Sequence, residues 1–182
     1  MLRIEVPLGP EQWDEAKEEF VPPPVKVLHL EHSLVSLSKW ESKYLKPFFN
    51  PKDEKSAEEL LDYIKMMTVT PNVQPEVFDR LTDANVRDIR AYIDAPMTAT
   101  TFRNDGKSKV NRDIITSEII YYWMIALQIP DRYDKWHINR LLTLIRVCNE
   151  KNAPPKKRGQ TATARRYAAM NAERRARLKT KG

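Results

Sequence analysis

The sequence has very few glycines and cysteines. Its 182 residues include one cysteine, Cys148, and four glycines, at positions 9, 106, 159 and 182. Because no two glycines lie close together, the glycine-rich loops that hold phosphates, bind dinucleotides or present a catalytic nucleophile are excluded. A lone cysteine excludes an internal disulfide framework and favours a reducing compartment.

Secretory and membrane-spanning segments are also missing. Residues 1–7 contain no apolar core of signal-peptide length and no cleavage-site pattern. The apolar stretch before Pro130 holds roughly a dozen apolar residues, whereas a transmembrane helix needs about 20. The sequence therefore predicts a cytoplasmic protein with no membrane partner.

Net positive charge is confined to the C-terminal end. Residues 153–182 carry ten Lys or Arg side chains and one Glu, which gives this segment a charge of +9. Since the formal net charge of the whole chain is +6, the other residues carry −3. The chain is therefore a mildly acidic body with a basic tail. A basic footprint over the whole domain, as nucleic-acid binders show, is absent from the body.

Two helices separated by Pro130 dominate the apolar pattern. The first, from Ile114, is apolar nearly all round, and such a helix is normally buried at the centre of a domain. The second has apolar residues at helical spacing: Ile138, Leu141, Leu142, Ile145 and Cys148. We therefore predict a mainly α fold, a compact helical domain around a buried αα-hairpin.

The first 31 residues have the pattern of strands. Residues 2–7 and 25–31 alternate between apolar and polar side chains, which predicts a small β-hairpin-like pair that needs a helix to lie against. Between them, residues 11–20 form a short acidic stretch, and we expect Trp13 and Phe20 to pack onto the body.

Further helices are predicted between the strands and the central hairpin. Helical spacing runs through residues 33–46 and stops at Pro47. Ser56 and Glu59 form a capping box, and Thr82 is a second N-cap candidate, so helices are expected to begin at both places.

The basic tail is the clearest feature outside the predicted core. We divide the chain into a helical body with its N-terminal strand pair, residues 1–152, and a basic linker and tail, residues 153–182. The Ala- and Arg-rich residues 161–178 favour a helix that forms fully only against a partner. The tail is interpreted as a partner-binding helix, with a nucleic-acid arm and a solvated extension as alternatives. The candidate binding residues are Lys156, Lys157, Arg158, Arg165, Arg166, Arg174, Arg175 and Arg177.

Two clusters have the residue types of a functional site. His29 and His32 with Cys148 could suggest zinc, but no second closely spaced ligand pair accompanies them, so packing and capping roles are favoured. Trp136, His137, Asn139 and Arg140 place polar groups beside a large aromatic. No nucleophile–base pair accompanies this second cluster, so we predict structural roles and assign no catalytic, cofactor-binding or metal-binding residue.

Glu118 is the most informative polar residue of the apolar helix. A buried carboxylate needs a partner, and Arg140 or His137 could supply it. We predict that Glu118 and Arg140 form a buried structural pair. In the alternative arrangement, Arg140 packs over or beside an aromatic ring.

Four stretches together resemble the tail assembly chaperones of long-tailed bacteriophages. They are Leu30–Ser42 (LEHSLVSLSKWES), Pro96–Thr100 (PMTAT), Thr116–Met124 (TSEIIYYWM) and Lys135–Leu144 (KWHINRLLTL). The resemblance covers residues 30–151, while residues 131–135 are more charged than the family pattern leads one to expect.

The resemblance implies a largely helical, non-enzymatic protein of the infected host cytoplasm. Proteins of this family bind the long tape measure protein and keep it soluble while tail tube subunits polymerise around it, and some also exist in a longer frameshifted form. The partners that the resemblance implies are therefore the tape measure protein and the tail tube protein, and a second copy of the chain is a separate candidate. A nucleic-acid-associated or virion structural protein acting through the basic tail is the alternative.

Overall fold

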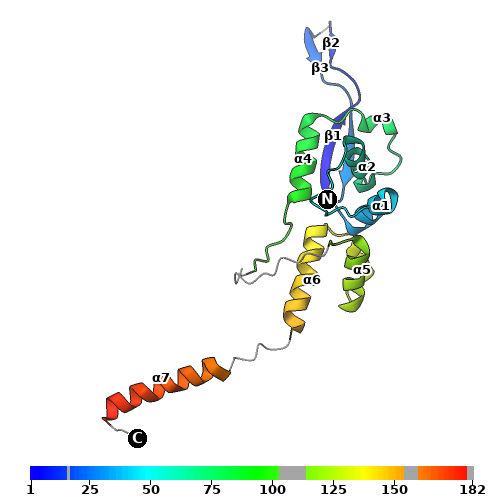
Figure 1. Cartoon of the computed structure of the whole chain (residues 1–182). Coiled ribbons are helices and arrows are strands. Elements are labelled where there is room, and N and C mark those ends of the chain that lie inside the picture. Colours follow the sequence, from blue (N-terminus) through cyan, green and yellow to red (C-terminus); the bar gives the residue numbers. More distant parts are fainter. Residues whose placement is uncertain (16, 103–113, 154–159, 180–182) are drawn as a thin grey trace. The chain divides into compact units, whose positions relative to one another are not determined.

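The structure is a computed structural model that describes residues 1–15, 17–102, 114–153 and 160–179, with the backbone alone at 160–163. The chain divides into two compact units, residues 1–149 and 150–182. The first unit combines several α-helices with a small antiparallel sheet, and the predicted mainly α fold is confirmed (Figure 1). No described helix has both the length and the hydropathy that crossing a membrane requires.

Strands β1 (Leu2–Pro7) and β4 (Val25–Leu30) form the predicted pair. They are antiparallel, with Leu2 opposite Leu30 and Pro7 opposite Val25. Alternate residues of both strands are buried, because side chains on a strand alternate between its two faces. One face of the pair therefore enters the core, as the sequence pattern indicates.

A second, shorter ladder continues this hairpin away from the core. Strands β2 (Gln12–Asp14) and β3 (Glu19–Val21) pair with each other, and we call residues 11–21 the distal ribbon (Figure 1). Trp13 and Phe20 do not pack on the body as predicted. They lie opposite each other on the ribbon with exposed fractions of 52% and 64%, because the ribbon runs past the point where the helices cover β1 and β4.

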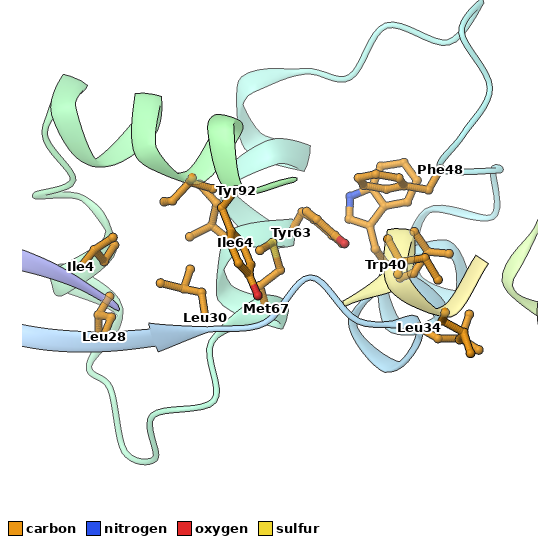
Figure 2. Packing of buried hydrophobic residues seen from close by; sticks show 14 of the residues in the cluster. Ile4, Leu28, Leu30, Leu34, Trp40, Phe48, Tyr63, Ile64, Met67 and Tyr92 are labelled. Atoms are coloured by element: carbon orange, nitrogen blue, oxygen red, sulfur yellow. The ribbon is translucent and has the colours of Figure 1, made fainter. Parts of the chain in front are cut away.

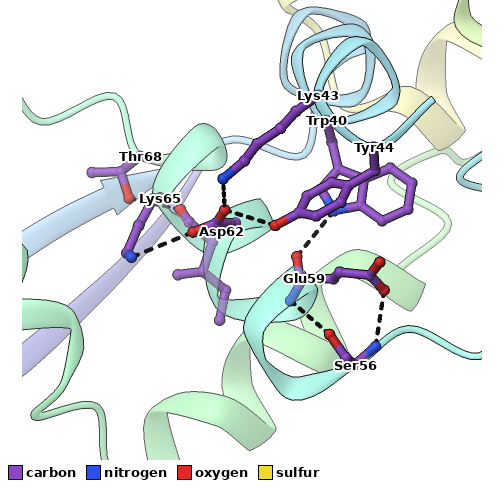
Figure 3. A network of polar contacts seen from close by, with 9 residues as sticks. Trp40, Lys43, Tyr44, Ser56, Glu59, Asp62, Lys65 and Thr68 are labelled. Carbon is purple, nitrogen blue, oxygen red and sulfur yellow. Dashed lines mark hydrogen bonds and ion pairs between the residues drawn. The ribbon is translucent and has the colours of Figure 1, made fainter. Parts of the chain in front are cut away.

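Helix α1 (Leu34–Tyr44) packs against α2 (Ala57–Met67) through one apolar and one polar contact zone. The buried Trp40 donates its indole N–H to the carbonyl oxygen of Glu59 at 3.0 Å. Lys43 and Tyr44 both hydrogen-bond to the Asp62 carboxylate, and these bonds lower the pKa of Asp62 to about 2 (Figure 3).

Helix starts follow the predicted capping residues. The Ser56 hydroxyl accepts from the Glu59 amide while the Glu59 carboxylate accepts from the Ser56 amide, so the predicted capping box is confirmed (Figure 3). Thr82 caps α4 (Asp83–Asp94), which follows the short helix α3 (Pro75–Phe78) and packs on β1. Asn85 of α4 donates to the Glu5 carbonyl at 3.1 Å and so fixes the helix to the sheet.

The predicted central hairpin consists of α5 (Ser117–Ala126), a 3-10 turn η1 (Asp131–Lys135) and α6 (Ile138–Asn152). Helix α5 packs against α1. Helix α6 is joined to the start of α1, because the Ile138 amide donates to the His32 carbonyl at 2.7 Å.

The hydrophobic core draws on most elements of the first unit. Figure 2 shows Ile4, Leu28 and Leu30 of the sheet beside Ile64 and Met67 of α2. The sheet, α1 and α2 supply more of the buried side chains than α5 and α6 do. Helices α5 and α6 therefore line the core, and the predicted compact domain around a buried αα-hairpin is wrong in this respect, because α5 packs on α1 and not on α6.

The second unit contains helix α7 (Gln160–Leu178), close to the predicted 161–178. All its described side chains, from Ala164 onward, are exposed.

Candidate protein-docking surface

Helix α5 is apolar on a side that the protein leaves open to solvent. Only Ser117, Ile120 and Met124 are buried. Tyr122 and Ile125 have exposed fractions of 66% and 76%. The prediction that this helix is buried nearly all round is therefore wrong, because no other described element of the first unit covers its outer side.

Three exposed residues of α5 and the half-buried Ile119 form one continuous face. Ile119, Tyr122 and Ala126 follow one another at intervals of three and four residues, and Ile125 lies beside them, so the four project from the same side of the helix. We call these four residues the open face of α5. Single exposed apolar side chains are ordinary, whereas an adjacent group of them marks a surface that binds a partner.

The buried carboxylate of Glu41 holds α5 in place. One oxygen accepts from the Ser117 amide at 2.7 Å and the other from the Phe48 amide at 2.8 Å. Glu41 is 7% exposed, and it therefore caps the positive end of α5 where the Thr116 side chain makes no capping bond. The sequence analysis missed this role, although helical spacing from Leu34 places Glu41 on the inward side of α1.

A cleft adjoins the first turn of α5. It has a volume of about 480 Å³ and is lined by Glu41, Ser42, Leu45, Lys46, Pro47, Thr116 and Glu118. Leu45 is 89% exposed and ends α1 in the left-handed conformation, at φ 54°. Glu118 lies one helical turn from Tyr122, so the apolar Leu45 and the open face of α5 border the same surface.

The predicted buried pair of Glu118 and Arg140 is wrong. Both residues are exposed, because Glu118 lies on the outer side of the first turn of α5. Hydrogen bonds from its own amide and from the side chains of Thr116 and Ser117 lower the pKa of Glu118. Arg140 instead stacks on Trp136, with 3.9 Å between the guanidinium carbon and the ring centroid, which confirms the alternative arrangement.

A buried polar cluster joins α1, α2, α4 and α6. The His32 and His137 rings are 5.1 Å apart between centroids, and His32 Nδ1 is 2.5 Å from the Tyr63 hydroxyl. The Tyr92 hydroxyl donates to Glu31 at 2.6 Å. Burial and the neighbouring His137 lower the pKa of His32 to about 3, and burial lowers the pKa of His137.

The geometry around His32, His137 and Tyr63 fits neutral side chains with fixed protons. His137 Nε2 lies 2.9 Å from the Tyr92 carbonyl and donates to it, while Nδ1 accepts from the Asn139 amide at 3.3 Å. Burial raises the pKa of Tyr63, which keeps its proton and donates to His32. Side chains held in this way join elements of the body, and the Asn139 amide group does the same by donating to the carbonyls of Ile93 and Ala95.

No group of three His, Cys, Asp or Glu side chains that could hold a metal ion is found among the described residues. His32 is engaged with Tyr63, and Cys148 is half-buried on α6.

The structure places only part of the predicted basic binding segment. Arg165, Arg166, Arg174, Arg175 and Arg177 are exposed on α7, within the second unit. Lys156, Lys157 and Arg158 lie outside the described residues.

Comparison of the chain with protein-family models, with curated proteins and with solved structures finds no match. A functional proposal must therefore rest on the structure itself. The surface that supports one is the open face of α5, with the adjoining cleft and Leu45.

Proposed function

We propose that this chain is a phage tail assembly chaperone that binds amphipathic helices of the tape measure protein in the host cytoplasm. The observation that carries the proposal is the open face of α5, a row of apolar side chains on a helix that the body holds rigidly through Glu41. The four stretches that resemble this chaperone family give the second line of support, since two of them contain most of α5, up to Met124, and the first turns of α6.

The chemistry of the surface suits a helical partner. A partner helix recognises a groove or face through apolar residues spaced by three or four positions, which is the spacing on the open face of α5. The charged groups at its edge, Lys46 and Glu118, stand at the end of the face where α5 begins. They would set the direction and register of the bound helix, while the apolar residues supply most of the affinity.

The role is non-enzymatic in this proposal. The chain binds exposed apolar helices of a long, aggregation-prone protein and shields them from water until tail tube subunits replace it. The tail tube protein is then a second partner, met when the tape measure protein is handed over.

Co-expression with the cognate tape measure protein tests the proposal. We expect the soluble fraction of the tape measure protein to rise with the intact chain and to fall back with Tyr122→Asp or Ile125→Asp. Burying an isoleucine contributes about 1.5–3 kcal/mol, so Ile125→Asp should weaken binding tenfold or more. Val25→Asp, at another half-exposed apolar position, is the matched control.

The results of this experiment test the function and the binding surface separately. A tape measure protein that is equally insoluble with and without the chain would refute the proposal. Solubilisation that survives both α5 substitutions would reject the open face as the binding surface. Thermal melts of each variant are needed, and we expect little change because both side chains are mostly exposed.

The alternative function is nucleic-acid or virion binding through the basic tail. The exposed arginines of α7 favour it, since each contact with a phosphate adds a salt-dependent increment to affinity. A mobility shift that weakens steeply with salt and disappears in Arg174→Glu/Arg175→Glu would support this alternative. No binding at low salt would exclude it.

A further inference from the structure

The distal ribbon carries an aromatic pair that has no place in the core. Trp13 on β2 lies directly opposite Phe20 on β3, with ring centroids 5.0 Å apart and an interplanar angle of 68°. More than half of each side chain is exposed, at 52% and 64%. The described residues of both strands are exposed or half-buried.

Such a ribbon gains little stability from its own contacts. A two-stranded hairpin is marginal in water, and one aromatic cross-strand pair contributes only about 0.2–1 kcal/mol. Exposed tryptophan and phenylalanine are costly to leave in solvent, and aromatic residues are enriched at the centres of protein interfaces. The pair therefore has the properties of an interface anchor.

The charge around the anchor defines the class of partner. Residues 11–19 contain five carboxylates and one lysine, a net charge of −4. A ribbon of this charge repels nucleic acid and anionic lipid, although aromatic pairs elsewhere serve as stacking platforms for bases. It attracts a cationic polypeptide, whose Lys or Arg side chains also interact favourably with aromatic faces.

Helix α7 has the complementary properties. Tyr167, Met170 and Leu178 are exposed at 60%, 40% and 68%, and with Arg174 they follow the spacing of one helical face. Residues 164–179 contain six Lys or Arg side chains against Glu173. Helices in proteins gain most of their stability from packing of an apolar face, and every described side chain of α7 is exposed, so a partner that covers its apolar residues would stabilise it.

We propose that the distal ribbon of one copy of this chain binds α7 of a second copy. The apolar residues of this face of α7 cover Trp13 and Phe20, while Arg174 on the face and the arginines beside it meet the carboxylates of the ribbon. When each of the two copies supplies both its distal ribbon and its α7, the same contact forms twice. This inference is independent of the open face of α5 and of the proposed chaperone function.

Self-association of the full-length chain tests the proposal. Sedimentation velocity over a wide range of protein concentration should show a concentration-dependent increase in mass at low salt. The association should weaken as salt rises from about 0.05 M to about 0.5 M, because the Debye length shortens from roughly 14 Å to roughly 4 Å. Trp13→Ala/Phe20→Ala should weaken it by about tenfold or more, as truncation of interface aromatics does.

Charge reversal provides the decisive control. Arg174→Glu/Arg175→Glu should abolish self-association, and so should Glu15→Arg/Glu19→Arg on the ribbon. The chain that carries all four substitutions should associate again, since the signs are exchanged on both sides. None of these side chains is buried, so the circular dichroism and thermal midpoint of the body should stay unchanged.

Three results would overturn the proposal. The first is a chain that stays monomeric at all concentrations. The second is association that persists in Trp13→Ala/Phe20→Ala. The third is association that Ile125→Asp removes and the ribbon variants do not, because copies would then meet through α5; failure of this kind leaves the tape measure experiment unaffected.

Discussion

Replacing Glu41 tests whether one buried carboxylate fixes the helix that carries the docking surface. Its two oxygens accept from the amides of Ser117, in the first turn of α5, and of Phe48, in the segment that follows α1. In Glu41→Gln the amide oxygen can accept one of these bonds, and the other N–H then faces an NH₂ group. In Glu41→Ala both N–H groups lose their partner.

The expected loss in the free energy of unfolding follows from these two hydrogen bonds. A hydrogen bond to a charged group contributes about 1.5–3 kcal/mol, and a buried donor left without a partner costs about 1–3 kcal/mol. We expect the free energy of unfolding to fall by about 2–3 kcal/mol in Glu41→Gln and by about 4–5 kcal/mol in Glu41→Ala. Since domains of this size have a total stability of about 5–15 kcal/mol, the alanine variant should be close to unfolding at 37 °C.

Urea unfolding of both variants measures the loss, and Glu118→Gln is the matched control. Glu118 is the neighbouring carboxylate, exposed at the same helix end, and its replacement should cost below about 1 kcal/mol. Hydrogen exchange should show that the first amides of α5 lose protection in Glu41→Gln before the sheet does. A loss below about 0.5 kcal/mol in Glu41→Gln, or equal losses at both positions, would refute the reasoning.

Three further predictions concern the rest of the body. Because burial holds the pKa of His32 at about 3, the unfolded chain takes up a proton that the folded chain does not between pH 6.5 and about 3. The free energy of unfolding should therefore fall by about 1.4 kcal/mol per pH unit as pH decreases through that range, and His32→Gln should reduce the slope measured in urea by one proton. Ser56→Ala removes one half of a capping box and should cost about 1 kcal/mol in thermal or urea unfolding, with Ser56→Thr close to the wild type. Leu45→Gly should raise stability by up to about 1 kcal/mol, since a leucine in the left-handed conformation is strained, and under the proposed function it should also weaken tape measure binding; a variant that is less stable would contradict the strain.

Local sequence signals predicted most elements of the fold. Alternation located β1 and β4, and the capping box of Ser56 with the N-cap candidate Thr82 located the starts of α2 and α4. These signals depend on neighbouring residues alone, so they can be recognised in the sequence without knowledge of the tertiary contacts. The N-cap Thr82 and its box partner Asn85 show the limit of such a signal, because Asn85 also donates to Glu5, a contact that no spacing rule contains.

The open face of α5 was not predicted, because periodicity measures composition and not coverage. An apolar helix has the same sequence whether its outer side meets the core or a partner protein, and for α5 the sequence analysis chose the core. Glu118 was then taken as the buried carboxylate, whereas Glu41 holds that position. The distal ribbon was missed for a related reason, since three-residue strands between prolines are too short to show alternation.

The hydrogen bond from the Ile138 amide to the His32 carbonyl also determines when the body can finish folding during synthesis. The sheet and the pair of α1 and α2 are made from neighbouring parts of the chain and can assemble early, whereas this bond joins residues separated by more than half of the chain. Until α6 has left the ribosome, the positions of Ile138, Leu141 and Ile145 in the core stay empty. The nascent protein therefore exposes apolar surface for most of its synthesis and gains its final stability only when its last core helix arrives.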